Sequence, residues 1–475
     1  MKYIASIGLE VHVQLKTDSK MFCSCRTSFG DKPNANICPV CLGYPGTMPT
    51  MNEKAICYTV MTGLMTGSSI SNYSKFDRKS YFYPDMPKNY QISQYDMPLC
   101  VGGSVEIESD AGARSVALCR IHLEEDVAKN LHFANHSGVD FNRAGTPLME
   151  VVTEPDMVSP DEALAFLLAL KQILQYVGAS DCNLEEGNLR CDVNCSVRPE
   201  GTETLGTKSE IKNLNTFKGV HDALAYEIVR QVEALQNGER IVQDTRRWDV
   251  DAGATFQMRS KEAAHDYRYF PEPDLMPVVL LQEQIDTWKK GLPELPGARR
   301  KRFVAQYGLP EYDARVLAGD REVADLFEQA ASFNTDYKSV SNWIMTELLR
   351  HLSETGKTVA SLPLTPKALA DLVALVGGGK VTSTSAKEIL GELMAHGGDP
   401  ATIMQARGLV QVNDSDELSM FVNEAVADNP KSVEDYRKGK KAAIQFLVGQ
   451  VMKQSRGKAN PQIVAQLVRE RIDAH

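Results

Sequence analysis

The sequence predicts an α+β protein: an N-terminal domain with a mixed or antiparallel sheet, then an all-α helical domain and a small helical tail domain. Strand-like alternation, most histidines and all ten cysteines fall before about residue 290. Segment 291–297, Gly-Leu-Pro-Glu-Leu-Pro-Gly, is rich in turn residues and indicates a boundary. Helical periodicity dominates after it, with a second break near 397–400. We therefore expect three domains: residues 1–292, 293–405 and 406–475.

The composition is that of a globular protein, with 43% hydrophobic and 24% charged residues in a chain of 475. No apolar run approaches the roughly 18 residues that cross a bilayer, and the N-terminus lacks the apolar stretch of a signal peptide. We therefore expect a cytoplasmic protein with no membrane contact. The formal net charge of −10 argues against a generic polyanion binder. The basic groups are segregated, however, because residues 425–475 hold 10 Lys and Arg against 5 Asp and Glu.

One helix of the first half has clear local signals. Ser159, Pro160 and Glu162 supply an N-cap, a proline at the first helical position and an acid three residues after the cap. The helix is expected to run to Val177 and end at Gly178. Its apolar positions surround most of its circumference, which predicts a buried, structural helix. In the second half, apolar residues recur at helical spacing in three candidates: 321–331, 340–353 and 366–376.

Strands with acidic faces are the main chemical signal of the first half. Residues 3–15 alternate, which places Leu9 and Val11 on one face and Glu10 and His12 on the other. For a single strand of this kind, a solvated strand face is the better explanation. The design recurs in three further segments, whose shared polar faces carry these sets: Glu150 and Glu154; Arg190, Asp192 and Asn194; Lys208, Glu210 and Lys212.

Such strands, laid side by side, could build one polar cavity. Carboxylates that hold magnesium, with Arg and Lys to bind phosphates, are what a magnesium–nucleotide site requires. Residues 121–126 add three consecutive acids, and alternation alone leaves open whether Glu124 or Glu125 faces the cavity. Neither the phosphate-loop pattern nor the kinase H-R-D and D-F-G pair occurs. An ATP site would therefore lie outside the commonest nucleotide-binding folds.

Four cysteines have the spacing of metal ligands. Cys23-x-Cys25 is followed after twelve residues by Cys38-Pro-Val-Cys41. Four thiolates complete a tetrahedral zinc shell and leave no open position for catalysis, so the pattern predicts a structural zinc. The alternative is a set of free, buried cysteines.

Two segments combine cations with aromatic residues. Residues 76–91 interleave Arg and Lys with Tyr and Phe, a mixture that can stack on bases and contact phosphate. An ordinary strand and turn with partly buried tyrosines explains it as well. Residues 259–274 repeat the mixture with two prolines, which suits the edge of a site. In the tail, segments 436–441 and 453–458 place cations at helix ends, where they are either solvated or in contact with phosphate.

Several long motifs resemble one known family. They lie in these segments: 7–15, 38–46, 77–85, 88–91, 122–126, 266–274, 446–453 and 457–461. Together they are similar to the B subunits of aspartyl/glutamyl-tRNA(Asn/Gln) amidotransferases, and the resemblance spans essentially the whole chain.

This resemblance implies a cradle domain with a kinase site, a helical domain, and a tail that contacts tRNA. The family uses ATP and Mg²⁺ to phosphorylate the side-chain carboxylate of Glu-tRNA(Gln) or Asp-tRNA(Asn). An amidase, known as the A subunit, hydrolyses glutamine and sends ammonia through a channel to the acyl phosphate, which gives Gln-tRNA(Gln) or Asn-tRNA(Asn). A small C subunit clamps the pair. The resemblance also implies a magnesium set: Glu10, His12, Glu125 and Glu150.

The remaining expected site residues follow from the same resemblance and from the strand faces. With the magnesium set, the expected catalytic residues include Asp192 and Glu210. Arg78, Lys79 and Arg190 are expected to bind the nucleotide.

Two other functions fit the same residues. A non-catalytic RNA-binding protein would use the cysteine knuckle and basic tail, and predicts that Glu10→Ala and Glu125→Ala leave activation intact. A metal-dependent phosphohydrolase would also use clustered carboxylates, and predicts phosphate release from ATP without dependence on aminoacyl-tRNA.

Overall fold

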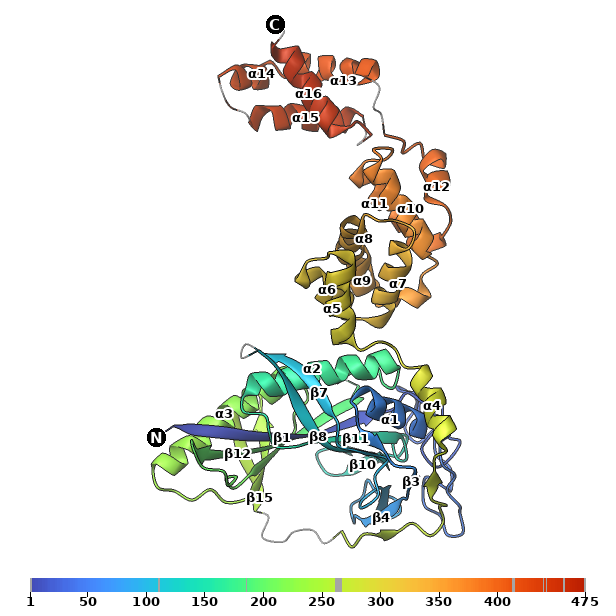
Figure 1. Ribbon diagram of the computed structural model, residues 1–475, viewed down its shortest axis with the longest axis vertical. Coiled ribbons are helices and arrows are strands. Elements are labelled where there is room, and N and C mark those ends of the chain that lie inside the picture. Colours follow the sequence, from blue (N-terminus) through green and yellow to red (C-terminus); the bar gives the residue numbers. More distant parts are fainter. Residues whose placement is uncertain are drawn as a thin grey trace. The chain divides into compact units, whose positions relative to one another are not determined.

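The computed structural model describes residues 2–109, 112–184, 186–260, 267–411, 415–438, 440, 442–455 and 458–473. Parts of the cation-bearing segments 259–274, 436–441 and 453–458 therefore lie outside the described residues. The chain divides into two units, Met1–Pro296 and Gly297–His475. The first unit contains the sheet and the second is helical (Figure 1), which confirms the α+β class.

A ten-stranded sheet organises the first unit. Its order is β15-β14-β13-β12-β1-β11-β8-β6-β2, and β7 pairs with β8. The strands run antiparallel to their neighbours, except that β13 and β14 are parallel. The bounds are β1 Tyr3–Gln14, β2 Ser69–Ile70, β6 Cys100–Val101, β7 Ser104–Ser109, β8 Gly112–Glu125, β11 Pro147–Thr153, β12 Leu189–Pro199, β13 Ser209–Lys212, β14 Asp244–Asp249 and β15 Ala254–Ser260.

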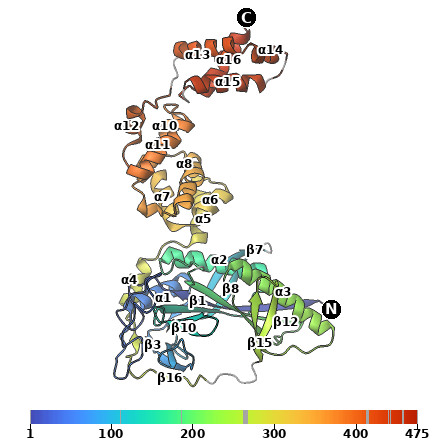
Figure 2. The ribbon, with the colours of Figure 1, turned by 180° about the vertical axis from the view of Figure 1, so that it is seen from behind.

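Helices cover one face of this sheet, as Figures 1 and 2 show. Leu9, Val11 and Val13 of β1 are at most 1% exposed and belong to the same hydrophobic core as Phe166 and Leu170 of α2. Because side chains alternate along a strand, the polar residues of β1 face the other way. The helices of this unit are α1 Glu53–Met65, α2 Pro160–Val177, α3 Phe217–Gln236 and α4 Gln282–Lys290.

Helix α2 forms as its local signals predict. The side chain of Ser159 accepts a hydrogen bond from the backbone N–H of Glu162, and Pro160 opens the helix. Gly178 ends it in the left-handed conformation, with φ of 75°, which glycine adopts without strain. The predicted bounds of this helix are confirmed.

Smaller sheets lie beside the large one. The most important for the site joins β16, β4 and β5 in that order, so it pairs residues near 78 with residues near 270. The remaining strands are β3 Tyr73–Ser74, β4 Asp77–Ser80, β5 Tyr90–Ser93, β9 Lys129–His132, β10 Ser137–Asp140, β16 Phe270–Pro271 and β17 Val278–Val279.

The second unit is built from short helices. Its described residues form two hydrophobic clusters, one within 303–409 and one within 418–472. The three helices predicted in this half are confirmed, and the one expected at 340–353 continues through a π-helical turn. The bounds are α5 Pro296–Tyr307, α6 Glu311–Leu317, α7 Arg321–Ala331, α8 Tyr337–Trp343, η1 Ile344–Leu348, α9 Leu349–Thr355, η2 Val359–Ser361, α10 Pro366–Gly377, α11 Ser383–His396, α12 Pro400–Ala406, α13 Ser415–Asp428, α14 Pro430–Arg437, α15 Ala442–Gln454 and α16 Pro461–Asp473.

Candidate functional site

Four side chains form a row across four neighbouring strands of the large sheet. His12 on β1 lies opposite Arg190 on β12 and opposite Glu150 on β11. Glu150 in turn lies opposite His122 on β8. Residues directly opposite one another in an antiparallel pair project from the same face, with Cβ atoms about 4.5–5.5 Å apart. Four distant parts of the sequence therefore meet on the face that the helices leave uncovered.

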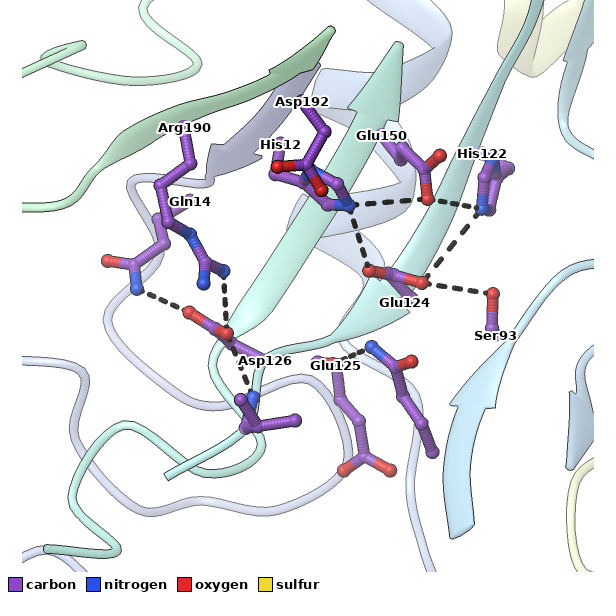
Figure 3. A network of polar contacts seen from close by, with 12 residues as sticks. His12, Gln14, Ser93, His122, Glu124, Glu125, Asp126, Glu150, Arg190 and Asp192 are labelled. Carbon is purple, nitrogen blue, oxygen red and sulfur yellow. Dashed lines mark hydrogen bonds and ion pairs between the residues drawn. The ribbon is translucent and has the colours of Figure 1, made fainter. Parts of the chain in front are cut away.

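The two imidazoles and the Glu150 carboxylate of this row converge with a second carboxylate, that of Glu124 on β8 (Figure 3). Nε2 of His12 lies 3.6 Å from Oε2 of Glu150 and 3.9 Å from Oε1 of Glu124. Nε2 of His122 lies 3.3 Å from the same Glu150 oxygen and 4.0 Å from Oε2 of Glu124. Ser93 on β5 donates from Oγ to Glu124 at 3.2 Å. Both carboxylates are therefore held in place by neighbouring strands.

The pKa of Glu150 is held well below its ordinary value. Burial by itself raises the pKa of this carboxyl, but the charge and hydrogen bond of His122, with the charges of His12 and Lys79, outweigh that effect. Glu150 is therefore a carboxylate whose negative charge can hold a cation.

A buried carboxylate fixes Arg190 at one end of the row. Nη2 of Arg190 lies 2.8 Å from Oδ1 of Asp126, and Gln14 donates to Oδ2 of Asp126 at 2.7 Å. Arg143 lies 3.5 Å from Oδ2 as well. Burial raises the pKa of Asp126, but the charges of Arg190 and Arg143 outweigh it and lower the pKa below its ordinary value. The ionised carboxylate thus orients the guanidinium.

A cavity of about 230 Å³ opens over His12 and Arg190 of the row. Its lining comprises His12, Lys79, Tyr81, Gln91, Glu124, Asp126, Val127, Leu148, Arg190, Asp192 and Tyr267. Burial lowers the pKa of Lys79, but the negative charges around it, Glu124 first, raise the pKa above its ordinary value, so Lys79 is a cation. The cavity therefore combines carboxylates with two cations, Lys79 and Arg190, as a metal–nucleotide site requires.

Glu10, Asp192 and Glu210 lie on the same face beside the row. Asp192 lies opposite Glu10 across β12 and β1. Nζ of Lys212 lies 2.5 Å from Asp192 and 3.2 Å from Glu210, while Asn194 donates to Glu10 at 3.0 Å. The expected ligand Glu10 is therefore on the expected face, but its partner there is an amide.

Glu125 and Arg78 lie outside the row. Glu125 follows Glu124 on β8 and points to the other side of the strand, where both its oxygens lie 2.5 Å from Nζ of Lys88. Arg78 donates two hydrogen bonds to Glu272, of 2.6 and 2.8 Å. Both residues line a second cavity of about 250 Å³. Glu125 was expected in the magnesium set and Arg78 at the nucleotide; the structure places Glu124 with the histidines instead, because successive residues of a strand point to opposite sides.

His122 was absent from the residues expected from the sequence, and Glu124 was left open against Glu125. The signal for both was the alternation of segment 121–124, where buried Ile121 and Leu123 occupy the other face. That alternation places His122 and Glu124 on one face of the strand, and Leu123 and Glu125 on the other. It did not show which of these two faces lies at the cavity, because the register against β11 decides this.

The row fits a divalent cation. Ligand atoms of His12, Glu124 and Glu150 all lie within 4.8 Å of one another. Six ligands about 2.1 Å from one ion are roughly 3.0–4.2 Å apart, so small side-chain movements bring these atoms to one ion. Carboxylates suit Mg²⁺ and Mn²⁺, whereas an imidazole suits transition metals better than Mg²⁺. The donor set therefore accepts Mg²⁺ and favours Mn²⁺.

A separate group joins Cys23, Cys25, Cys38 and Cys41. Their Sγ atoms lie within 4.8 Å of one another, and none forms a disulfide. Four thiolates bound at about 2.3 Å to a tetrahedral zinc are roughly 3.8 Å apart, so the group fits zinc. A hydrogen bond from Cys23 lowers the pKa of Cys41, and Nζ of buried Lys20 lies 3.6 Å from its sulfur. The thiolate that zinc requires is thus favoured at Cys41.

None of the described helices combines the length with the apolar composition that a bilayer crossing needs.

Known protein families match both halves of the chain. Residues 5–286 match the GatB/GatE catalytic domain, and residues 325–472 match the GatB domain. The chain is 53% identical over 473 residues to the B subunit of the aspartyl/glutamyl-tRNA(Asn/Gln) amidotransferase of Caldanaerobacter subterraneus, covering 99% of this chain and 100% of that protein. It is 51% identical to the B subunit from Carboxydothermus hydrogenoformans, covering 99% of each chain. With the B subunit from Thermodesulfovibrio yellowstonii the identity is 50%, over 98% of this chain and 99% of that one. The chain belongs to the family of aspartyl/glutamyl-tRNA(Asn/Gln) amidotransferase B subunits.

Proposed function

We propose that this chain is the component of a tRNA-dependent amidotransferase that uses ATP to phosphorylate the side-chain carboxylate of Glu-tRNA(Gln), Asp-tRNA(Asn) or both. Ammonia released from glutamine by a partner amidase then converts the activated group to the amide, which gives Gln-tRNA(Gln) or Asn-tRNA(Asn). The relatives are named as B subunits of aspartyl/glutamyl-tRNA(Asn/Gln) amidotransferases, which supports this reaction and the ligase class.

One observation carries the assignment of the activating step to this chain. His12, Glu124 and Glu150 converge within 4.8 Å, and the cavity that holds His12 and Glu124 also holds the cations Lys79 and Arg190. Carboxylates and cations in one cavity are what phosphoryl transfer from a metal-bound nucleotide needs.

The chemistry follows from the poor reactivity of a carboxylate toward ammonia. Transfer of the terminal phosphoryl group of ATP to a carboxylate oxygen forms a mixed anhydride and ADP. Ammonia attacks the acyl carbon, phosphate leaves with the bonding pair, and the amide remains. A divalent ion held by His12, Glu124 and Glu150 would offset charge on the transferring phosphoryl group.

The other residues of the cavity bind and orient. Lys79 and Arg190 attract the phosphate oxygens, and Asp126 fixes Arg190 so that its guanidinium needs no reorganisation when phosphate binds. Glu10, Asp192 and Glu210 remain part of the proposed site, as the wall next to the row. In this wall, Asp192 and Glu210 pair with Lys212. Arg78 and Glu125 are not assigned to nucleotide or metal in this proposal, because Glu272 and Lys88 already pair with them.

We further propose a structural zinc at the four cysteines and assembly with two partners, the amidase A subunit and the small C subunit. The basic tail, within residues 406–475, contacts the tRNA, and the domains divide at 292/293 and 405/406. The two separate hydrophobic clusters of the helical unit, the first ending at Leu409 and the second beginning at Leu418, support a division a few residues after this second boundary. We propose a cytoplasmic location, where tRNA substrates occur.

The test measures activation alone. The chain, assembled with its partner subunits, is incubated with labelled Glu-tRNA(Gln) or Asp-tRNA(Asn), ATP and Mg²⁺ without glutamine. Hydroxylamine traps any acyl phosphate as the side-chain hydroxamate, and only this product is counted, separated from the α-carboxyl hydroxamate that hydroxylamine forms with the tRNA ester. ADP and hydroxamate should form only with the aminoacyl-tRNA. Glu150→Gln should abolish both products, and Glu233→Gln, an exposed control on α3, should leave them unchanged.

The same assay separates the alternatives. ADP formation that proceeds without aminoacyl-tRNA identifies a phosphohydrolase. Full activation by Glu150→Gln identifies an RNA-binding protein whose carboxylates have no catalytic role.

A further inference from the structure

The small β16-β4-β5 sheet unites the two aromatic segments of the sequence. Phe270 on β16 lies opposite Arg78 on β4, and the backbone N–H of Ser80 donates to the carbonyl of Tyr267 at 2.9 Å. Strand β4 is labelled in Figure 1 and β16 in Figure 2. Residues almost 200 positions apart therefore form one surface at the mouth of the proposed site.

Five rings on this surface form a tyrosine row: Tyr95, Tyr269, Tyr267, Tyr81 and Tyr83. Tyr95 and Tyr269 stack with centroids 4.2 Å apart and an angle of 12°. Tyr269 meets Tyr267 edge-on at 6.1 Å, and Tyr81 meets Tyr83 at the same centroid distance. Tyr267 and Tyr81 both line the cavity of the proposed site. The row thus consists of two groups, one of Tyr95, Tyr269 and Tyr267 and one of Tyr81 and Tyr83, and each group reaches the cavity through its inner ring.

The outer rings of the row face solvent. Tyr95 and Tyr83 are each 52% exposed. A single exposed aromatic ring is ordinary, but these rings form two groups of contacting rings whose inner members, Tyr267 and Tyr81, line one cavity. The row is therefore a surface that a flat, apolar ligand can cover.

Cations accompany the rings. Nζ of Lys79 lies 4.9 Å from the centroid of Tyr267, and the guanidinium of Arg268 lies 5.8 Å from that of Phe82. Aromatic rings for bases and cations for the backbone together characterise surfaces that bind single-stranded nucleic acid.

We propose that the tyrosine row binds the unpaired 3′-terminal bases of the aminoacyl-tRNA by stacking. This inference rests on the proposed function, because it takes aminoacyl-tRNA as the substrate. The amino acid is esterified to the terminal ribose, so the terminal base must lie close to the reacting carboxylate. The inner rings of the row satisfy this condition, since they share the cavity with Glu124 and Lys79. The single adenine of ATP would stack on only one ring, whereas a row of rings that extends to the solvent can stack with several successive unpaired bases.

The test compares tRNA binding by ring-deletion and ring-retaining variants of the assembled complex. Tyr95→Ala and Tyr269→Ala should each weaken binding of aminoacyl-tRNA by about tenfold, the loss expected for one stacked base. Tyr95→Phe and Tyr269→Phe keep the ring and should bind as the unaltered complex does. Tyr73→Ala removes an equally exposed tyrosine outside the row and is the matched control.

Two further measurements identify the ligand. The unaltered complex should bind intact tRNA more tightly than tRNA trimmed of its 3′-terminal nucleotides, and the alanine variants should lose this preference. A fluorescent base analogue at the 3′ terminus should be quenched on binding to the unaltered complex and to the phenylalanine variants only. The KM for ATP should not change.

Each contrary outcome overturns the inference. If the alanine variants raise the KM for ATP and leave tRNA binding intact, the row binds the nucleotide base. Unchanged binding of both ligands leaves the row without this role. Because binding is measured without ATP or turnover, it is independent of the activation assay: a complex that prefers intact tRNA but forms no tRNA-dependent ADP contradicts the proposed function alone.

Discussion

Nε2 of His122 lies 3.3 Å from Oε2 of Glu150, and the two residues face each other directly across β8 and β11. Nε2 of His12 approaches the same oxygen from β1, at 3.6 Å. Glu150 is therefore held between two imidazoles from opposite neighbouring strands. This arrangement orients one carboxylate oxygen before any cation is present.

The first prediction concerns His122 as an orienting residue. His122→Ala should weaken Mn²⁺ binding by about 10- to 100-fold, the usual effect of removing a group that orients a metal ligand. Mn²⁺ binding is measured by electron paramagnetic resonance on the assembled complex. His122→Asn, which retains a donor, should recover part of the affinity. Equal affinity in His122→Ala and the unaltered protein would exclude this role.

The second prediction separates the two successive glutamates of β8. Glu124→Gln should strongly reduce the affinity for Mn²⁺, because Glu124 contributes an oxygen to the three-residue group. Glu125→Gln should leave that affinity within a factor of about two, since its side chain pairs with Lys88 on the other side of the strand. Titration calorimetry with Mn²⁺ checks both variants. The opposite ranking would restore Glu125 to the metal site.

The third prediction is a pH dependence of stability. Asp126 has a lowered pKa in the folded state, so its ionised form stabilises the fold above the ordinary Asp value of about 3.9, and this stabilisation is lost as the pH falls through the folded-state pKa. Asp126→Asn should therefore cost about 3–5 kcal/mol at neutral pH, because Arg190 and Arg143 lose their charge partner. The difference from the unaltered protein should shrink below about pH 4.

Denaturant unfolding at several pH values measures this difference. Asp181→Asn, which breaks an exposed ion pair with Lys16, is the control and should cost less than about 1 kcal/mol at any pH. The prediction is contradicted if Asp126→Asn lowers the free energy of unfolding by no more than the control does, or if this loss does not change with pH.

The fourth prediction concerns the cysteine group. Cys41→Ser should lower the zinc content of the purified protein from one ion per chain toward zero and reduce the thermal midpoint, because a structural zinc contributes folding energy. Cys57→Ser, a cysteine outside the group, should retain the zinc. Elemental analysis and thermal unfolding give the two readouts. A full zinc content in Cys41→Ser would place the ion elsewhere.

The sequence predicted features that depend on neighbouring residues. Helix α2 was predictable because Ser159, Pro160 and Gly178 fix both ends through local backbone geometry. The polar face of β1 was predictable because alternation along a strand is local too. The placement of Glu10 and His12 on one face follows from this alone.

Features that depend on distant segments were not predictable. The choice between Glu124 and Glu125 depends on how β8 registers against β11, where Glu124 lies opposite Leu148 and Glu125 opposite Pro147. We expected Arg78 to bind phosphate, because the sequence shows no partner for it, but in the structure it donates to Glu272. No local pattern specifies a partner that is distant in the sequence, so the surroundings of Glu125 and Arg78 could not be predicted from the sequence.

The bidentate contact between Arg78 and Glu272 joins residues 194 positions apart, and with the β4–β16 pairing it fixes β4, which carries Lys79 of the proposed site, only late in synthesis. One wall comes from β4, early in the chain, and its partner β16 emerges from the ribosome only after some 270 residues. Closing so long a loop is slow compared with forming local hairpins and helices. A nascent or truncated chain that stops before β16 therefore carries the polar row and the tyrosines without the strand pairing that holds β4 beside residues near 270, and the first unit becomes complete only as its last strands are made.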